Sequence, residues 1–335
     1  MIFFFILIIL INIFIVIYFD KISKLVNLFD VPDGVRKIHK KKTPLLGGSM
    51  FLLNLFFFVI YYFINNSIFN LDYFSTSKEI IIFSAFSLSF FLLGFFDDKF
   101  NLSANFKLIS KISLIFFLIC LEDQILIKEL RFSFSINKIN IENISYLFSV
   151  LCFLLFINAF NMFDGINLQS AIYSVFLFLI FLLKGIFIEI SYVLLIALLF
   201  FAYLNYKNKC FMGDNGTLLI SFILSYFFIK SAKVYNTFSA DEIFLIMLVP
   251  GLDLIRLFVT RILHHKHPFK GDNNHIHHIL LKVFGLHKSL FLLFLLIIIP
   301  NILSMIYGGT LYLILISVII YSSLIFFLNS YKKNY

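Results

Sequence analysis

The sequence predicts an all-α integral membrane protein with about eleven transmembrane helices. Two features of its composition indicate this, because 61% of the residues are hydrophobic and only 13% are charged. A soluble domain is nearer half apolar and a quarter charged, so this chain has more apolar surface than a soluble core could bury. The third feature is the arrangement, since long apolar segments alternate with short polar connections along the whole chain.

Each apolar segment approaches the roughly 20 residues that a helix needs to cross a bilayer. The expected spans cover residues 2–19, 46–64, 79–96, 107–121, 146–162, 168–187, 190–206, 217–232, 242–262, 288–307 and 309–330. A count of ten is the alternative, because the last two are split only near Gly308 and Gly309. The first span lacks a basic start and a small-residue cleavage site, so we expect it to be retained within a single membrane domain over residues 1–335.

The basic residues predict the orientation in the membrane. The connections after odd-numbered spans, with the adjoining span ends and the tail, hold 20 of the 27 Lys and Arg, and the other connections hold 7. Positive residues concentrate on the cytoplasmic side, which puts the N-terminus outside and the C-terminus in the cytoplasm. In this setting the net charge of +9 indicates loops facing anionic lipid or an anionic substrate rather than nucleic acid.

Five polar clusters fall on this predicted cytoplasmic side. They cover residues 31–48, 94–101, 158–167, 211–216 and 264–278. Polar groups gathered at one face of a helical bundle are typical of a site built from loop ends. The alternative function, a transporter of an anionic solute or a divalent cation, predicts polar groups near mid-membrane and on both faces. The nearly uncharged spans disfavour it.

Three acidic residues are candidate metal ligands. Asp97 and Asp98 are adjacent at the end of a predicted span, where two carboxylates repel unless a positive group lies beside them. Mg²⁺ prefers such hard oxygen ligands and leaves positions for phosphate and water. Asp214 lies in a Gly-Asp-Asn-Gly turn at a helix start and could be a third ligand. The ordinary explanations are a solvated helix end and a plain turn.

A histidine-rich run contains His275, His277 and His278. Residues three apart share a helix face, so we expect His275 and His278 to point together and His277 to point away. Zinc binding is one interpretation, but no HExxH helix and no nearby Cys accompany the run. Basic neighbours such as Arg261 favour phosphate binding. The missing HExxH also disfavours an intramembrane metalloprotease.

Two further clusters are candidate binding segments. The basic residues Arg36, Lys37 and His39 precede Thr43, and positive-inside topology with lipid head groups is their ordinary explanation. Asn158, Asn161 and Asp164 recur every three residues and form a polar stripe on a helix. Such groups at a membrane edge are unfavourable unless they are paired or functional. Hydrogen bonding between helices is the alternative to binding a uracil or sugar amide.

Taken together, these stretches form an ordered set of motifs. They read Arg36-Lys37-x-His39 with Thr43-Pro44-Leu45-Leu46-Gly47-Gly48, Gly94-x-x-Asp97-Asp98, Asn158-x-x-Asn161-x-x-Asp164-Gly165, Met212-Gly213-Asp214-x-Gly216 and Pro268-Phe269-x-x-Asp272-x-x-His275-x-His277-His278. Between about residues 20 and 281 the set resembles, in the same order, the polyprenyl-phosphate N-acetylhexosamine-1-phosphate transferases, glycosyltransferase family 4. Val31-Pro32-Asp33 with Arg36-Lys37-x-His39 is more similar to the GlcNAc-1-phosphate branch than to the phospho-MurNAc-pentapeptide translocases.

The resemblance implies a reaction in the bacterial cytoplasmic (inner) membrane. A sugar-1-phosphate moves from a UDP-N-acetylhexosamine, UDP-GlcNAc or a relative, to undecaprenyl phosphate and releases UMP, as the first membrane step of cell-surface glycan synthesis. It implies Mg²⁺ or Mn²⁺ as cofactor and allows a homodimer. The implied catalytic residues are Asp97, Asp98, Asp214, His277 and His278. The family's usual candidate for the base or nucleophile is Asp97 or Asp98, whereas we expect the three Asp mainly to hold the metal. The implied substrate-binding residues are Arg36, Lys37, His39, Thr43, Asn158, Asn161, Asp164, Arg261 and His275.

One departure from the family concerns the donor. The family usually has Gly-Leu where this chain has Leu168-Gln169, directly after the polar stripe. We expect this difference to affect the nucleotide or sugar pocket more than the chemistry.

Overall fold

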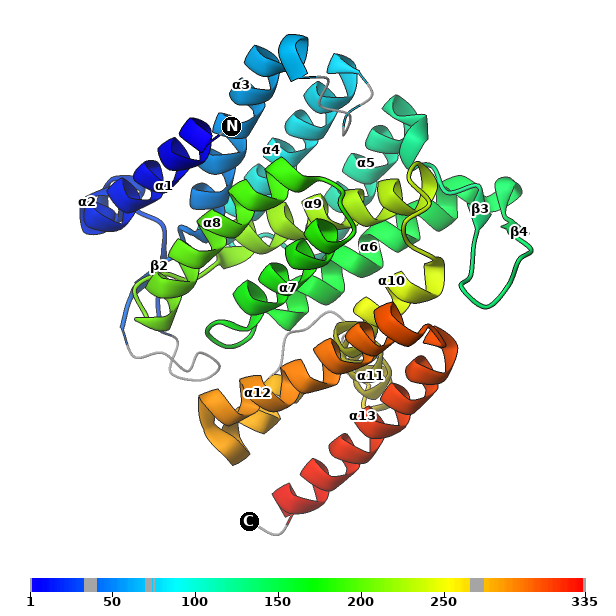
Figure 1. Ribbon diagram of the computed structural model, residues 1–335. Helices are drawn as coiled ribbons and strands as arrows, with labels where there is room; N and C mark the ends of the chain where they lie inside the picture. Colours follow the sequence, from blue (N-terminus) through cyan, green and yellow to red (C-terminus); the bar gives the residue numbers. More distant parts are fainter. Residues whose placement is uncertain (1, 33–40, 70–73, 75, 266–273, 334–335) are drawn as a thin grey trace. The chain divides into compact units, whose positions relative to one another are not determined.

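The computed structural model describes residues 2–32, 41–69, 74, 76–265 and 274–333. The described residues form thirteen α-helices, and the all-α prediction is confirmed (Figure 1). The helices are α1 (Ile2–Ile17), α2 (Phe19–Val26), α3 (Gly47–Phe69), α4 (Ser77–Phe100), α5 (Ala104–Leu121), α6 (Ser145–Phe163), α7 (Gln169–Leu183), α8 (Ile188–Tyr206), α9 (Gly213–Lys233), α10 (Ala240–Ile246), α11 (Leu248–Leu263), α12 (Ile276–Tyr307) and α13 (Thr310–Lys333). Two short antiparallel pairs accompany them, β1 (Phe29–Asp30) with β2 (Thr43–Pro44) and β3 (Glu129–Leu130) with β4 (Ile139–Asn140).

The chain folds into two compact units. Unit 1 comprises Met1–Ile125 and Ser170–Phe227, and unit 2 comprises Leu126–Gln169 and Phe228–Tyr335. Within unit 1, α8 packs against α1 and α3, and α4 packs against α3 and α5. Within unit 2, α11 packs against α6, and α10 to α13 pack against one another. The prediction of a single domain over the whole chain stays a prediction.

Each predicted apolar segment corresponds to a helix or to a bent helix pair, although segment 168–187 extends past both ends of α7. Among the described residues, eight helices are long and apolar enough to cross a membrane. The pairs α1–α2 and α10–α11, bent by 75° and 71°, raise the number to ten if each pair is one span, and α7 is a shorter apolar helix. The chain is therefore a polytopic membrane protein. The count of eleven and the orientation of the termini stay predictions.

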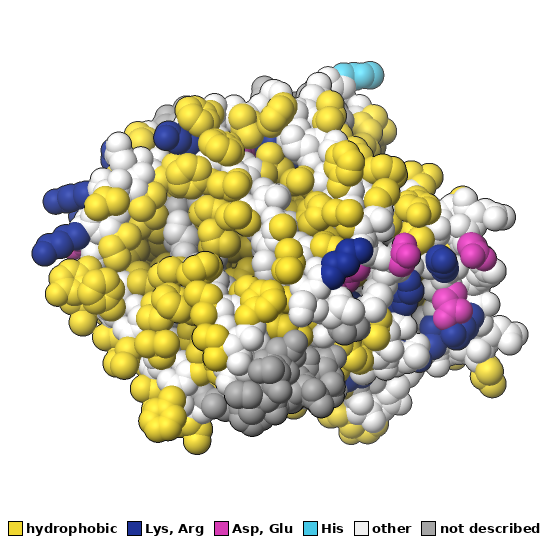
Figure 2. Space-filling view, turned by 90° about the horizontal axis from the view of Figure 1, so that it is seen from above, with side chains coloured by type: hydrophobic (Ala, Val, Ile, Leu, Met, Phe, Trp, Pro, Cys, Tyr) yellow, Lys and Arg dark blue, Asp and Glu magenta, His cyan; other side chains and the backbone are white. Residues whose placement is uncertain are grey.

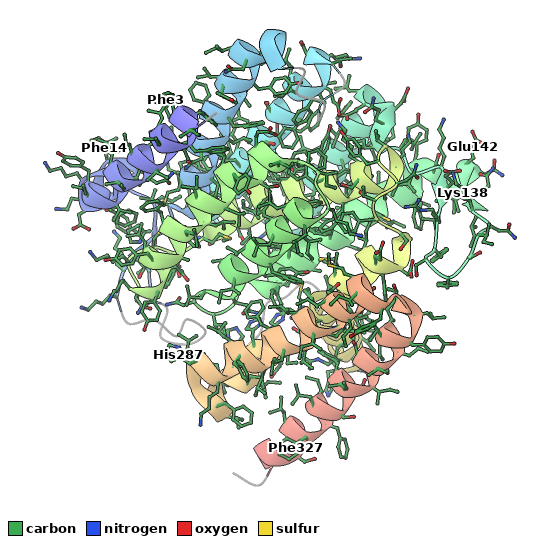
Figure 3. The ribbon with its side chains drawn as sticks, viewed as in Figure 1. Phe3, Phe14, Lys138, Glu142, His287 and Phe327 are labelled. Carbon is green, nitrogen blue, oxygen red and sulfur yellow. The ribbon has the colours of Figure 1, made fainter. Side chains whose placement is uncertain are left out.

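The surface fits a lipid environment. Hydrophobic side chains cover much of the face seen in Figure 2. Phe3 and Phe14 on α1 and Phe327 on α13 point outward (Figure 3), and Phe3 is 88% exposed. A soluble protein rarely exposes apolar patches of this extent, so these helices present faces that a bilayer would cover.

Helix α9 is the most deeply buried of the candidate spans, with 94% of its span buried. Aromatic rings hold it within unit 1. Phe222 stacks on Phe90 of α4 at 4.7 Å between ring centroids, and Phe227 stacks on Phe187 at 4.0 Å. Offset aromatic pairs add stabilisation beyond the area that they bury. The first turn of α9, which carries Asp214, is thus attached to a firmly packed helix.

Helix α12 begins earlier than the sequence predicted. The expected span started at residue 288, but α12 starts at Ile276 and takes in two of the histidines of the polar run. Gly285 interrupts it with φ of 73°. Glycine occupies positive φ without the steric penalty of a Cβ, so the break separates the segment with His277 and His278 from the long apolar one.

A pair of amides joins two helices in the apolar part of unit 1. Asn12 on α1 and Asn54 on α3 are fully buried. Each side-chain amide donates to the other's oxygen, at 2.8 and 3.2 Å. Each also donates to a backbone carbonyl of its own helix, at Ile8 and Met50. Buried amides in a membrane helix are tolerated because they are paired in this way.

Replacing Asn54 by Leu is expected to lower the unfolding free energy by about 0.6–2 kcal/mol. The leucine has a similar size, but it leaves the Asn12 amide with only its own helix as partner. Unfolding in detergent by added denaturing surfactant measures the change. The double variant Asn12→Leu, Asn54→Leu should recover stability, and a single variant as stable as wild type would show that the pair contributes nothing.

Candidate functional site

In unit 1, the segment before α3 lies beside the segment before α9. The Phe211 N–H donates to the Pro44 carbonyl at 2.9 Å, and the Gly47 N–H donates to the Phe211 carbonyl at 3.2 Å. Leu45 and Phe211 form a parallel bridge. Thr43, a predicted binding residue, is 2% exposed and its hydroxyl donates to the Lys41 carbonyl at 3.1 Å. Two motifs far apart in the sequence are therefore neighbours.

Glycines allow three helices to meet closely at this point. A Cβ on Gly94 of α4 would lie 2.3 Å from the Asp214 carbonyl oxygen. A Cβ on Gly48 of α3 would lie 2.1 Å from the Asn215 side-chain oxygen. No real Cβ makes such contacts, so both positions need glycine for the first turn of α9 to approach α3 and α4.

Asp98 holds the start of α9. Its Oδ1 accepts from the Asp214 N–H at 2.9 Å, and its Oδ2 accepts from the Asn215 N–H at 3.0 Å. The Asn215 side-chain amide also donates to Oδ2. A carboxylate at a helix N-terminus satisfies free N–H groups and interacts favourably with the helix dipole. Asp98 thereby fixes the position of Asp214, and its predicted part in metal binding stays a prediction.

Asp97 and Asp214 face each other. Their carboxyl groups lie within hydrogen-bonding reach, and Lys107 of α5 donates to Asp97 Oδ2 at 2.8 Å. Lys111, one turn further along α5 and 9% exposed, interacts electrostatically with both Asp214 and Asp97. We call Asp97, Asp98, Asp214, Lys107 and Lys111 the acidic cluster. Two carboxyl groups at this distance repel when both are charged, unless a proton or a cation lies between them.

The acidic cluster fits a divalent cation. Asp97 and Asp214 present hard oxygen donors, which Mg²⁺ and Mn²⁺ prefer. Their mutual approach is the arrangement that a shared cation would relieve. Both oxygens of Asp98 accept from α9, and the oxygens of Asp97 accept from the Leu102 N–H at 3.0 Å and from Lys107, so these hydrogen bonds single out none of the three Asp as the ligand. Magnesium binding itself stays a prediction.

Unit 2 contains the histidines. The rings of His275 and His277 stack with centroids 5.2 Å apart, and His277 and His278 are 4.3 Å apart. His275 and His278 are further apart, at 6.2 Å. The expectation that His277 points away from the other two is wrong. His275 is the extended cap residue before α12, with φ −60° and ψ 147°, so the helical three-residue rule does not apply to it.

His277 packs directly on Gly165. It is 1% exposed, and a Cβ on Gly165 would lie 1.8 Å from its Nε2. The ring also meets Phe163 edge-on at 6.5 Å. The glycine that follows the polar stripe therefore makes room for a histidine more than a hundred residues later. We call His275, His277 and His278 the histidine cluster.

The remaining predicted residues lie as follows. Asn158 and Asn161 are half-buried on α6, and Asp164 is its C-cap, so the predicted helical stripe is confirmed up to the end of the helix. Arg261 is on α11 and 5% exposed. Arg36, Lys37 and His39 lie outside the described residues.

The departure at Leu168 has a structural counterpart. Leu168 has φ of 69°, a region that glycine occupies freely and that leucine rarely adopts. The backbone thus keeps the conformation that a glycine would favour, and the side chain is added to it.

Sequence reasoning missed Lys107 and Lys111 of the acidic cluster and Asp253 beside the histidine cluster. Lys107 and Lys111 were counted only toward topology, although their four-residue spacing places both on one face of α5. Asp253 and Arg256 form an ion pair of 2.7 Å on α11. Ionisable residues inside a predicted span are themselves a signal of function, and that signal could have found Asp253.

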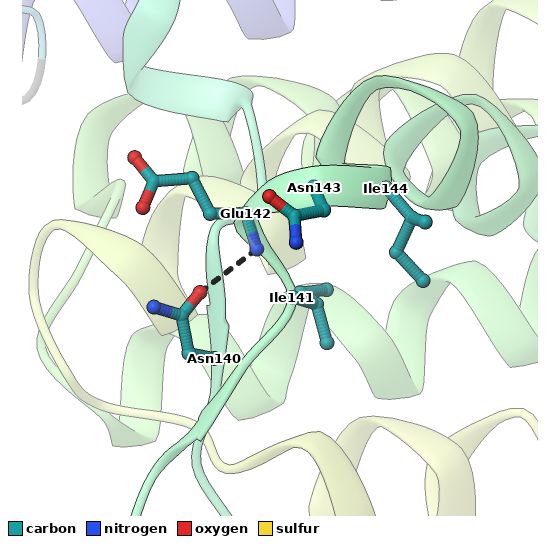
Figure 4. Close-up of a pocket in the computed structure, with 5 residues that line it drawn as sticks. All are labelled: Asn140, Ile141, Glu142, Asn143 and Ile144. Carbon is teal, nitrogen blue, oxygen red and sulfur yellow. Dashed lines mark hydrogen bonds between the residues drawn. The ribbon is translucent and has the colours of Figure 1, made fainter.

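A shallow pocket elsewhere contains none of the predicted residues. Asn140 to Ile144, which include the 3₁₀ turn η2 (Glu142–Ile144), line it (Figure 4). The Asn140 side chain accepts from the Glu142 N–H at 2.8 Å, as in an ordinary local turn. The pocket is made by five consecutive residues and brings no distant groups together.

Comparisons with known proteins confirm the resemblance. Residues 80–232 match glycosyl transferase family 4. The chain is 24% identical over 286 residues, 82% of this chain and 74% of the relative, to the undecaprenyl-phosphate alpha-N-acetylglucosaminyl 1-phosphate transferase of Escherichia coli (strain K12). It is 26% identical over 278 residues (81% and 79%) to the protein of that name from Thermotoga maritima. A Bacillus subtilis (strain 168) relative, named a probable undecaprenyl-phosphate N-acetylglucosaminyl 1-phosphate transferase, is 27% identical over 274 residues (79% and 73%).

Proposed function

We propose that this chain, with residues 80–232 in glycosyl transferase family 4, transfers a sugar-1-phosphate from a UDP-N-acetylhexosamine to polyprenyl phosphate and releases UMP. The observation that carries the proposal is the acidic cluster, in which Asp97, Asp98 and Asp214 meet beside two lysines. Relatives named for this reaction support it, with undecaprenyl phosphate as acceptor and N-acetylglucosamine as sugar. Those relatives do not favour the transporter alternative.

The reaction joins two anions, and the charges of the clusters suit that task. An oxygen of the lipid phosphate attacks the phosphorus that carries the sugar, and the bond from that phosphorus to the UMP oxygen breaks. Positive groups must offset the repulsion and the charge that develops on the leaving oxygen. In unit 1, Lys107 and Lys111 supply such charge. In unit 2, Arg256 and the histidine cluster offer N–H donors for phosphate or nucleotide groups.

The acidic residues are better suited to holding a metal than to acting as a base. A phosphate monoester has a second pKa of about 6, so the lipid phosphate is already largely dianionic at neutral pH. It therefore needs little help to become a nucleophile. Asp97, Asp98 and Asp214 would hold Mg²⁺ or Mn²⁺, which when bound neutralises phosphate charge and acts as a Lewis acid at the departing oxygen.

The proposal includes a location. The chain is an integral membrane protein. We place it in a bacterial cytoplasmic membrane, with the N-terminus outside and the C-terminus in the cytoplasm. Substrates then reach each cluster from the cytoplasm. The distribution of 20 against 7 basic residues supports this orientation. In that position it would catalyse the first membrane step of cell-surface glycan synthesis.

Membranes containing the protein should convert radiolabelled UDP-GlcNAc and undecaprenyl phosphate into a labelled lipid and an equal amount of UMP. Chelation with EDTA should abolish both products, and added Mg²⁺ or Mn²⁺ should restore them. Because Leu168 and Gln169 depart from the family, other UDP-N-acetylhexosamines belong in the same assay. Absence of lipid-linked product with every donor would overturn the proposed function.

A further inference from the structure

Asp253 on α11 contacts the residues that begin α12. It is 4% exposed, and a buried carboxylate is strongly unfavourable without partners. Its Oδ1 accepts from Arg256 at 2.7 Å, from the Tyr321 hydroxyl at 3.0 Å and from the Ile276 N–H at 3.1 Å. Its Oδ2 pairs with His275 Nδ1 at 2.8 Å. One carboxylate on α11 thus connects α11, the first turn of α12 and α13.

The contact with Asp253 determines which nitrogen of His275 is available. A carboxylate oxygen only accepts, so Nδ1 of His275 must carry the hydrogen. The other nitrogen, Nε2, has no hydrogen-bond partner among the described residues and is the one left for a ligand. The His275 ring stacks on His277, which packs on Gly165. The orientation of the His275 ring therefore affects the position of the His277 ring stacked on it, and through it the packing of the histidine cluster.

We propose that Asp253 is a positioning residue for the donor substrate: it fixes the tautomer and ring plane of His275 and holds the first turn of α12, which carries His277 and His278. This proposal rests on the proposed function, because the ligand of the cluster is the anionic nucleotide part of the donor. Asp253 acts through His275 and does not touch the substrate itself. It resembles the carboxylates that orient histidines in metal enzymes by binding the second ring nitrogen.

A metal site is the competing interpretation of the same residues. Asp253, His275 and His277 each offer one ligand atom, and these atoms lie within 4.8 Å of one another. The guanidinium of Arg256 already pairs with Asp253, and two further donors occupy the same carboxylate oxygen. A metal ion bound to Asp253 would therefore lie beside the positive charge of Arg256. The observations favour positioning, and metal binding becomes an outcome of the test.

The test compares Asp253→Asn with Asp241→Asn. Asp241 is a matched control, because it is also a buried carboxylate of unit 2 but binds Ser133, outside the histidine cluster. Asn keeps only one acceptor oxygen. Arg256 and the Ile276 N–H both donate to that position, so the NH₂ group of Asn would take the position that faces His275. We expect the KM for the UDP-sugar to rise about 10- to 100-fold, with the KM for polyprenyl phosphate unchanged. The control should stay within about twofold on both constants.

NMR of ¹⁵N-histidine-labelled protein in nanodiscs provides a readout that structural damage alone would not produce. His275, assigned with His275→Gln, should carry its hydrogen on Nδ1 in the wild-type protein and shift toward the Nε2–H form in Asp253→Asn. An Nε2–H form in the wild type would overturn the proposal even if the variant fails to fold. So would an unchanged donor KM, or one zinc per wild-type chain that Asp253→Asn loses. A wild type without turnover would refute the proposed function, and the NMR result would still decide on Asp253.

Discussion

Replacing Asp214 by Asn is expected to lower turnover by about 10³-fold while the protein still folds. The amide has the same shape, and the N–H groups that begin α9 still bind Asp98. The change removes one of the two carboxyl groups that face each other, Asp97 and Asp214. Turnover measured against Mg²⁺ concentration should show a weaker apparent affinity for the metal as well as a lower maximum. Asp97→Asn should change both quantities in the same direction.

The control is Glu129→Gln, the same chemical change at an exposed carboxylate of β3. It should leave turnover and the Mg²⁺ dependence unaltered. If Asp97→Asn abolishes turnover while the apparent metal affinity is unchanged, then Asp97 does not hold the metal, and a direct role as base or nucleophile would replace the one proposed for it.

The meeting of Asp97 and Asp214 is the part of the site that the sequence predicted best. Asp97 and Asp214 lie on the same predicted side of the membrane, which suggested a shared cation. More than a hundred residues separate them in the sequence. The close approach also depends on Gly48 and Gly94, whose missing side chains admit the first turn of α9. The role of Asp98 could not be predicted, because composition and spacing do not show which of two adjacent carboxylates turns toward a helix start.

The arrangement of the histidine cluster could be predicted from the sequence only in part. A helical rule applied to His275 and His278 wrongly directed His277 away from them, since His275 precedes the helix rather than belonging to it. Helix boundaries are the least certain part of a prediction from sequence, and here one residue of uncertainty exchanged His278 for His277 as the stacking partner. Asp253 was missed because its partners lie on three different segments, which only the fold brings together.

In both units a buried carboxylate fixes the start of a helix that carries residues of the proposed site. In unit 1 a carboxylate from α4 accepts the first N–H groups of α9, and in unit 2 a carboxylate from α11 accepts the first N–H group of α12. Helix starts carry unpaired N–H groups and partial positive charge, so a buried carboxylate is stabilised there. In a chain with few charged residues, these two carboxylates fix the helix turns that carry Asp214, His277 and His278.

Replacing Gly165 by Ala is expected to reduce turnover by about 10²-fold, the scale of loss that a displacement of about 1 Å produces in a catalytic site. The new Cβ would lie 1.8 Å from His277 Nε2 and 2.5 Å from its Cδ2. The imidazole is 1% exposed and packed against the two neighbouring histidines, so it must leave its position. Gly251→Ala on α11 is the control, since a Cβ there meets nothing within 4 Å.

A double-mutant cycle separates displacement of His277 from general damage to the fold. If the clash with the imidazole is the cause, the variant Gly165→Ala, His277→Ala should turn over no more slowly than His277→Ala alone, because the ring that the new methyl group meets is gone. Losses that add instead would mean that Gly165 acts independently of His277. Turnover of Gly165→Ala equal to wild type would contradict the packing of His277 on this glycine, and with it the link between the polar stripe and the histidine cluster.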